Sequence, residues 1–372
     1  MGVRPPVAVV DKNVASSDTC FLRTFPPHFI YLSFQDYKMT SLTLQTSLTL
    51  QESEIYDRQI RLWGIEAQQR LQSSRVLFAG NFCTTSAEIA KNLVLAGFSA
   101  TILDPNVVLP EDLGSNFLLT EDTIGKSRAL SAHANLQQLN PMVKVTSLQE
   151  PTSNVSADFI ATEKYNVVVL SGPIAMNEMV RINQACREAG AAFFFLDMYG
   201  FLGIGFSDLG DHFSYKTGSV DEGTDKVVTV QYTPINNALT TPWKELDAVR
   251  FGMSPIYFAW HCMLHYMNDN GLTSLSSADL EPLKLYGNEL CQKQDFDRTK
   301  LDDNIFETCT RCYGCDVGPA CAIMGGLIGQ EIVKSIARKK EPFQNVFVLD
   351  AMGEYSRGGV RVHVVPPSLK AK

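Results

Sequence analysis

Short apolar runs alternate with stretches of helical periodicity through the middle of this 372-residue chain. The apolar runs predict β-strands, and the amphipathic stretches between them predict helices. Strands are expected at residues 75–80, 99–104, 143–147, 166–171 and 191–196, and helices at 86–96, 125–139 and 174–189. The alternation predicts an α/β fold with a doubly wound, mainly parallel, Rossmann-like sheet.

The pattern changes at both ends of this region. Later strand-like runs occupy 227–232, 345–349 and 359–365, and prolines interrupt helical pieces between 211 and 304. We therefore expect one domain from 52–210 together with 305–372, and a helical insert at 211–304.

Residues 1–51 are predicted to be an N-terminal extension, in which the hexad TSLTLQ occurs twice in succession. Polar and apolar residues alternate in the hexads with the period of a strand, which allows an added edge strand. A flexible extension is favoured, because chain termini are usually poorly ordered. Met39 is an alternative start.

Composition excludes some partners. The chain carries 32 Lys and Arg against 40 Asp and Glu, a net charge of -8, and shows no basic stripe for a phosphate backbone, so we expect no nucleic-acid partner. No apolar run of about 18 residues and no signal-peptide core are recognised, so no membrane partner is expected. Nine scattered cysteines are typical of free thiols in a reducing compartment, the nucleus and cytoplasm.

The first strand–helix turn lacks the glycines of a phosphate-binding loop. After residues 75–80 the chain reads NFCTTS at 81–86. Glycines there let the backbone approach phosphate oxygens, which the next helix binds through its N–H groups. Thr85 and Glu88 have the spacing of a capping box, and Gly97 is placed to end that helix. The prediction is a preserved fold with a degraded nucleotide site, as in a partner subunit.

A resemblance to a known family follows from several motifs. The run YDRQIRLWG at 56–64 is the opening signature of the eukaryotic ubiquitin-like activating enzymes, and further blocks match at 88–97, 103–108, 124–129, 139–141 and 319–334. The resemblance covers about residues 51 to 365 and implies the adenylation fold shared with the bacterial ThiF and MoeB proteins. Within the family the chain resembles non-catalytic halves of the SUMO-activating type through residues 193–200 and 206–210 and its short middle region. The NEDD-type regulatory subunit, usually much longer, ranks second.

Departures from the active members of the family concern nucleotide binding. Active halves hold ATP and magnesium with a glycine loop, an Asn/Arg cluster, a lysine and an aspartate. Here GSNF at 114–117 replaces Asn-Arg-Gln-Phe, Arg128 replaces the lysine, and residues 166–177 contain no carboxylate. Magnesium prefers charged oxygen ligands. The resemblance therefore implies that ATP and magnesium are bound by the partner subunit, and it predicts no cofactor-binding residue and no metal ligand in this chain.

Arg58 is the one residue predicted to act in catalysis. In the family, the arginine of this signature crosses to the other half and contacts the phosphates of its ATP, where a fixed guanidinium stabilises charge on the leaving pyrophosphate. The alternative is a surface arginine paired with Asp57 or Glu54. Arg61 is expected to support packing or the interface, without a catalytic role.

Other candidate residues have competing interpretations. Asp104 stands where active halves bind ribose, but a structural role is favoured without a phosphate loop. The spacing of Cys309, Cys312 and Cys315 leaves zinc open, although no second Cys-x-x-Cys pair exists and ordinary thiols are favoured. His261 and His265 have the spacing of a helical metal pair, but their flanks favour a packed helix. Cys262 and Cys291 lie in contexts unlike a thioester-forming cysteine.

Taken with the resemblance, these features imply a function. The chain is expected to be the regulatory, pseudo-catalytic subunit of a heterodimeric SUMO-activating enzyme, not an enzyme alone. The implied partners are the catalytic subunit, in an obligate heterodimer, and a SUMO-type modifier, whose C-terminus is adenylated and then transferred to a cysteine of the partner. The alternatives are the NEDD-type regulatory subunit, a scaffold without catalytic contribution, and a self-sufficient adenylating homodimer.

Overall fold

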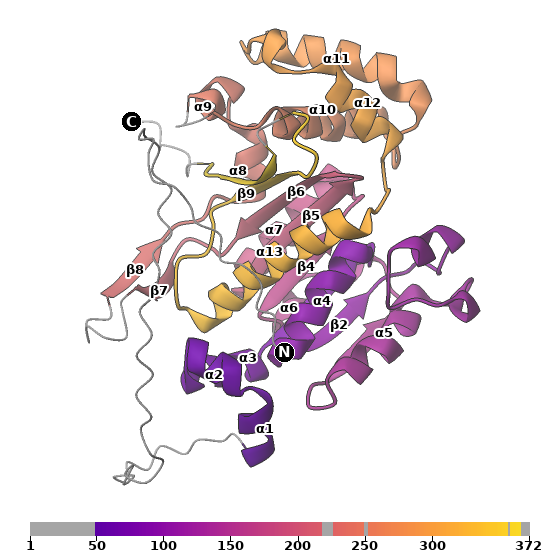
Figure 1. Ribbon diagram of the computed structural model, residues 1–372. Coiled ribbons are helices and arrows are strands. Elements are labelled where there is room, and N and C mark those ends of the chain that lie inside the picture. The colour runs from indigo at the N-terminus through magenta and orange to yellow at the C-terminus, as the bar shows by residue number, and fades with distance from the viewer. Residues whose placement is uncertain (1–48, 218–225, 249–251, 356–357, 366–372) are drawn as a thin grey trace, which may run out of the picture. The chain divides into compact units, whose positions relative to one another are not determined.

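An eight-stranded mixed sheet organises the protein, whose computed structural model describes residues 49–217, 226–248, 252–355 and 358–365 (Figure 1). Its strand order is β10-β9-β6-β5-β4-β1-β2-β3. The strands of this sheet are β1 Arg75–Gly80, β2 Ser99–Leu103, β3 Val145–Leu148, β4 Val167–Ser171, β5 Ala192–Tyr199, β6 Leu202–Asp208, β9 Val346–Asp350 and β10 Gly359–His363. A separate hairpin pairs β7 Phe213–Thr217 with β8 Lys226–Val230.

Five neighbouring strands, β3-β2-β1-β4-β5, are parallel, whereas β6, β9 and β10 continue the sheet in antiparallel pairs. Alternate side chains of the parallel strands enter two separate cores. Val76 and Phe78 of β1 face one core, and Leu77 and Ala79 face the other. In a parallel sheet buried on both faces, odd and even positions of each strand are both apolar, because successive side chains point to opposite faces. This explains the unbroken apolar runs in the sequence. The predicted doubly wound α/β fold is confirmed.

The longer helices cover both faces of the sheet. Helices α4, α5 and α13 lie on one face, and α6, α7 and α10–α12 pack on the other. Helices α1–α3 lie at the amino-terminal end of the described chain, where Trp63 and Ala67 pack against Ala337. The α-helices are α1 Leu50–Ile55, α2 Asp57–Trp63, α3 Ile65–Ser73, α4 Thr84–Ala96, α5 Arg128–Leu139, α6 Ala157–Thr162, α7 Met176–Ala189, α8 Ile235–Thr240, α9 Trp243–Asp247, α10 Pro255–Asn270, α11 Leu280–Lys293, α12 Asp303–Arg311 and α13 Gly318–Ala337.

The flanking regions set apart by the sequence differ in what the structure describes. Apart from 49–51, which begin α1 and its N-cap, the extension 1–51 and its hexads lie outside the described residues, as does Met39. In the 211–304 region, α10 packs directly on the sheet: the ring of Trp260 lies 5.9 Å from that of Phe195 in β5. These helices therefore extend the core on one face of the sheet.

Helix α13 is long and apolar enough to cross a membrane by length and composition. Its 18-residue window has a mean hydropathy of 1.3, so the sequence-based expectation of no such stretch overlooked it. However, 56% of that window is buried, because the helix lies along α4 and against the sheet (Figure 1). A core helix accounts for this apolar composition.

Candidate functional site

The β1–α4 turn stands where related folds bind phosphate, and here it folds inward. Gly80 has a φ of 96°, and a Cβ at this position would lie 2.7 Å from the carbonyl oxygen of Ser171, so the tight turn out of β1 requires glycine. The next apolar side chain, Phe82, is buried edge-on against Phe78 with ring centroids 5.7 Å apart. A phenyl ring in the core thus anchors the turn that a phosphate would otherwise order.

The expected capping box at the start of α4 is wrong. The helix begins at Thr84 with Cys83 as N-cap, and neither Cys83 nor Thr85 provides a side-chain cap. Instead, the backbone N–H of Thr84 donates to Oδ2 of Asp316 at 2.7 Å. This carboxylate comes from the loop before α13, far away in sequence, and it takes the place of a local cap at the positive end of the helix dipole.

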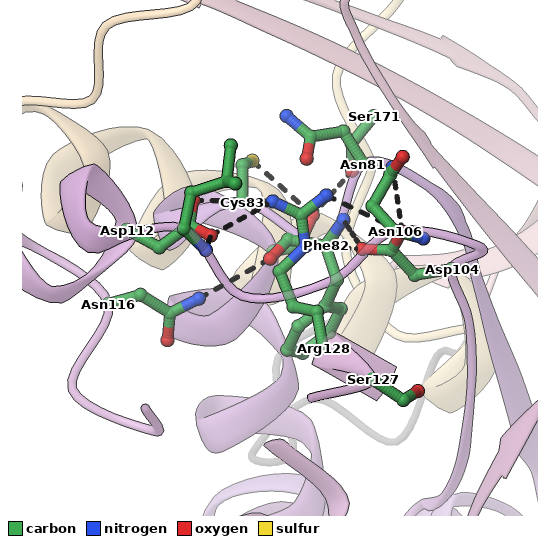
Figure 2. Close-up of polar contacts among 12 residues, drawn as sticks. Asn81, Phe82, Cys83, Asp104, Asn106, Asp112, Asn116, Ser127, Arg128 and Ser171 are labelled. Atoms are coloured by element: carbon green, nitrogen blue, oxygen red, sulfur yellow. Dashed lines mark hydrogen bonds and ion pairs between the residues drawn. The ribbon is translucent and has the colours of Figure 1, made fainter. Parts of the chain in front are cut away.

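A second carboxylate binds the turn itself. Asp104, fully buried at the end of β2, accepts the backbone N–H of Phe82 at 2.9 Å (Figure 2). Two N–H groups that could face phosphate oxygens are therefore already bonded to carboxylates of the same chain. An anionic ligand at this turn would have to displace both side chains against their negative charge.

Arg128 neutralises this cluster (Figure 2). Its Nε lies 2.6 Å from Oδ2 of Asp104, and its Nη1 lies 3.2 Å from Oδ1 of Asp112. Burial opposes the charge on Arg128, but the hydrogen bond to Asp104 and both carboxylate charges outweigh burial and raise the pKa of Arg128. Asn106 donates to the other oxygen of Asp104 from its backbone N–H and its side-chain amide, each at 2.9 Å. Asp104 thus has the structural role that sequence reasoning favoured, and Arg128 is its counter-ion.

A cavity of about 560 Å³ opens beside this cluster at the carboxyl ends of β1 and β2. Its charged lining residues are Glu111, Asp112 and Arg128, and the only cation among them is bonded to carboxylates. Its other lining residues are Gly80, Asn81, Pro105, Asn106, Val107, Leu109, Pro151, Thr152, Pro173, Ile174 and Gly314. Negative side chains without a free cation disfavour a polyphosphate here.

Asp197 of β5 is a carboxylate whose position the sequence did not reveal. A Cβ on Gly172, just after β4, would lie 2.6 Å from its carboxyl carbon, so the group lies directly beneath that turn. Tyr199 donates to Oδ2 at 2.6 Å and the backbone N–H of Met198 to Oδ1 at 3.1 Å. Burial raises the pKa of Asp197 from 3.8 to about 7, and the nearby charge of Asp316 adds to this effect. Asp197 is not among the residues that line the cavity.

Asp197→Asn is expected to remove a pH dependence of stability. Because the folded-state pKa of Asp197 exceeds its unfolded value, the unfolded chain releases this proton first, and stability falls as pH rises from about 4 to about 7. Each unit of pKa difference corresponds to about 1.4 kcal/mol. In thermal unfolding between pH 5 and 8, the melting temperature of the variant should rise relative to that of the wild type as pH increases. The control Asp158→Asn changes an exposed carboxylate, and its melting temperature should depend on pH as that of the wild type does. If the melting temperatures of Asp197→Asn and the wild type changed in parallel with pH, the raised pKa of Asp197 would be contradicted.

Arg58 lies on α2, far from this cluster. Helix α2 is fixed by its neighbours: the buried Tyr56 hydroxyl accepts a hydrogen bond from Asn140 at 2.8 Å, and Gln59 donates to the carbonyl of Leu95 at 3.3 Å. The Arg58 side chain is exposed, and the described residues offer it no hydrogen bond or ion pair. The expected alternative of pairing with Asp57 is not observed.

Asp57 pairs instead with Arg61, whose Nε lies 3.0 Å from its Oδ2 on the protein surface. The two arginines of the signature motif therefore differ: Arg61 is bonded within the helix, and Arg58 has no partner among the described residues. Helix α2 meets the carboxyl end of α4 through Leu95, whereas the β1–α4 turn lies at the amino end of that helix. The 13 residues of α4 span ~20 Å. Helix α2, which carries Arg58, is therefore separated from the degraded site of its own chain by the length of α4.

Comparison with known proteins places these features in a family. The ThiF family matches residues 56–363, more than four fifths of the chain. The chain belongs to the ThiF family. Among curated relatives of this ThiF-family chain, SUMO-activating enzyme subunit 1 of Rattus norvegicus is 32% identical over 329 residues, covering 81% of this chain and 92% of the relative.

Two further comparisons agree. SUMO-activating enzyme subunit 1B-1 of Arabidopsis thaliana is 34% identical over 312 residues, with 82% of this chain and 94% of the relative covered. The resemblance of this ThiF-family chain to the subunit 1 type is thus confirmed. The crystal structure of PaaA superposes with a TM-score of 0.51 at 16% identity, covering 89% of this chain and 88% of that one, and this likeness concerns the fold alone.

The cysteines considered for zinc in this ThiF-family chain differ in environment. Cys309 is buried, Cys312 is half-buried and Cys315 is exposed. Within the described part of the chain, no three His, Cys, Asp or Glu side chains are grouped to hold a metal ion. Burial raises the pKa of Cys291, and likewise that of Cys262, which disfavours either thiol as a nucleophile.

Of the two histidines of α10, His261 is buried and His265 is half-buried. Burial lowers the pKa of His261 to about 3, so its ring is neutral. Its Nδ1 accepts from Nε1 of Trp243 at 3.3 Å, and its Nε2 donates to the carbonyl of Leu239 at 2.6 Å. Both ring nitrogens of His261 are used in packing, in agreement with the favoured interpretation of this pair.

Proposed function

We propose that this ThiF-family chain is the regulatory subunit of a heterodimeric SUMO-activating enzyme. In this proposal the chain pairs permanently with the catalytic subunit, which binds ATP and magnesium, adenylates the C-terminus of the SUMO-type modifier and receives it as a thioester. The chain itself provides Arg58 and a scaffold. The names of its relatives and the arrangement of its two sites support this assignment. The eight described cysteines are free thiols, in keeping with a nuclear and cytoplasmic location.

The observation that carries the proposal is the contrast between the two sites. At the β1–α4 turn, the N–H groups of Phe82 and Thr84 are bonded to carboxylates of the same chain. At the other end of α4, Arg58 is exposed and unpaired among the described residues, on a helix held by Tyr56 and Gln59. A phosphate site closed by carboxylates, together with an exposed cation that no described residue pairs, suits a subunit that assists the nucleotide of another chain.

The chemistry assigned to Arg58 is electrostatic. Attack of a carboxylate on the α-phosphate of ATP expels pyrophosphate, and negative charge accumulates on the leaving group. A guanidinium keeps its charge at all physiological pH values and offers several N–H donors to phosphate oxygens. Because α2 is held by Tyr56 and Gln59, the backbone that carries Arg58 is already in place before a partner binds, and only the exposed side chain has to be ordered in the complex.

Exposed apolar side chains lie on α2, which carries Arg58, and on the two helices next to it. Ile55, Leu62 and Leu95 are 52%, 63% and 46% exposed, on α1, on α2 and at the end of α4. Permanent subunit interfaces are larger and more apolar than ordinary surface. We therefore place the contact with the catalytic subunit across these helices, which would bring Arg58 to the boundary between the halves.

The proposal is tested by ATP–pyrophosphate exchange with SUMO and magnesium. We expect the mixture of this chain with a SUMO-type catalytic subunit to be active, each subunit alone to be inactive, and Mg-ATP to leave the melting temperature of this chain alone unchanged. Activity of this chain alone would identify a self-sufficient adenylating enzyme. Activity only with a NEDD-type modifier and partner would reassign the chain to that pathway.

A further inference from the structure

A second cavity, of about 520 Å³, lies at the opposite end of the sheet, where β1, β4 and β5 begin. Its charged lining residues are Arg70, Lys164 and Arg338, and no carboxylate lines it. The chain continues from Arg338 into Lys339 and Lys340. These five residues form a surface that we call the basic face. It is local, since the chain as a whole has a net charge of -8.

The cations of the basic face have no acidic partners among the residues that the structure describes. In the described part of the chain, none of the five forms an ion pair, and four form no side-chain hydrogen bond. The fifth, Arg70, donates from Nη2 to the carbonyl of Ala337 at 2.7 Å, and its buried Nε has no partner. Nearby cations behave differently: Arg75 pairs with Glu163, and Lys334 with Glu331. The carboxylates of Glu163 and Glu331 are thus already engaged, and Glu341, next to Lys340 in the chain, interacts with Tyr215.

Backbone conformation at these positions would favour residues other than lysine and arginine. Lys164, Arg338 and Lys340 have φ values of 56°, 52° and 66°, in the left-handed region. Glycine or asparagine adopts this region more easily, and Arg338 occupies the C-cap of α13, where glycine is common. Basic side chains are therefore present at three positions where local conformation disfavours them.

Helix dipoles offer a simpler reason for cations here, because α3, α6, α7 and α13 all end near this cavity. A cation that serves this purpose is expected to bind the last carbonyls of a helix. Arg70 does so for α13. Lys164 and Arg338 form no such bond among the described residues; the guanidinium of Arg338 lies instead over the ring of Phe213, at 5.7 Å. Dipole compensation therefore explains Arg70 and leaves the others unexplained.

We propose that the basic face binds an acidic segment of a partner protein, with its carboxylate side chains entering the cavity between Arg70, Lys164 and Arg338. Charge complementarity with a cavity that no carboxylate lines carries this inference. A nucleic acid fits less well. A long phosphate backbone would extend beyond the basic face and be repelled by the net negative charge of the protein. The aromatic residues under the cations, Trp63 and Phe213, are buried and cannot stack with bases.

Fluorescence anisotropy of a fluorescein-labelled hexaglutamate peptide on the full chain tests the proposal. We expect saturable binding that weakens with salt, and a loss of affinity of about tenfold or more in the double variant Lys164→Glu/Arg338→Glu, since like charges then meet the peptide. The matched control Lys144→Glu/Lys293→Glu makes the same change in net charge at exposed lysines outside the basic face and should shift affinity less than about twofold.

Three outcomes would overturn the proposal. The first is absence of peptide binding by the wild type. The second is an equal loss of affinity in both double variants, which would indicate attraction by overall charge. The third is tighter binding of a single-stranded oligonucleotide than of the peptide, which would assign the face to nucleic acid. Melting temperatures of both double variants establish that each is folded before affinities are compared.

Discussion

Arg58→Ala is expected to lower ATP–pyrophosphate exchange by the proposed SUMO-activating heterodimer about 100-fold, the loss typical of removing one group that stabilises transition-state charge. The variant should still fold, because Arg58 is exposed and bonds to no described residue. It should also assemble, since Tyr56 and Gln59 continue to hold α2. The measurement is the exchange rate at saturating ATP and SUMO, with assembly checked by gel filtration.

Arg61→Ala is the matched control. It removes an equal charge from the same helix, but Arg61 is bonded to Asp57 on the surface, so exchange should change less than about twofold. The exchange rate of Arg58→Lys should lie between those of the wild type and the alanine variant, because lysine keeps the positive charge but lacks the planar set of N–H donors. Equal rates for Arg58→Ala and the wild type would reduce this chain to a scaffold.

Arg128→Met is expected to lower the free energy of unfolding by about 3 kcal/mol, because it leaves the fully buried carboxylate of Asp104 without its counter-ion. For a domain of this size such a loss corresponds to roughly 4–5 °C in melting temperature. Methionine keeps much of the volume of the arginine stem, so a cavity contributes little. The measurement is the thermal unfolding of the full chain at neutral pH.

The double variant Asp104→Asn/Arg128→Met separates charge from packing. It removes the buried carboxylate together with its partner, so it should recover part of the stability that Arg128→Met loses. Replacing an exposed arginine in the same way, Arg61→Met, should cost less than about 0.5 kcal/mol. If the double variant proved less stable than Arg128→Met, the Arg128–Asp104 charge pair would not be the source of the loss.

The strands of the parallel sheet were predictable because a sheet buried on both faces produces apolar runs. Strand β6 was missed, although all seven of its residues are buried. It contains Gly203, where a Cβ would lie 2.6 Å from the sulfur of Met198. Packing demands glycine at this position, whereas strand propensity disfavours it. A sequence pattern cannot report a contact that only the folded sheet creates.

At the candidate site, the loss of the phosphate loop was predictable from the missing glycines, but what replaces the phosphate was not. Thr85 was expected to cap α4, and the group that does so is Asp316, more than 200 residues away. A long-range cap leaves no local signal. Arg58, in contrast, was identified through its motif. Its exposure and its lack of partners among the described residues agree with that prediction without testing its catalytic role.

The two carboxylates at the β1–α4 turn also bear on stoichiometry. A symmetric dimer of intact ThiF-type halves would have two equivalent nucleotide sites, and its subunits could alternate or compete. In the heterodimer proposed here, Asp104 and Asp316 serve as built-in anions in one half, so each complex would hold a single ATP. The modifier would then have one possible direction of approach, and this half would keep its shape whether cellular ATP is abundant or scarce.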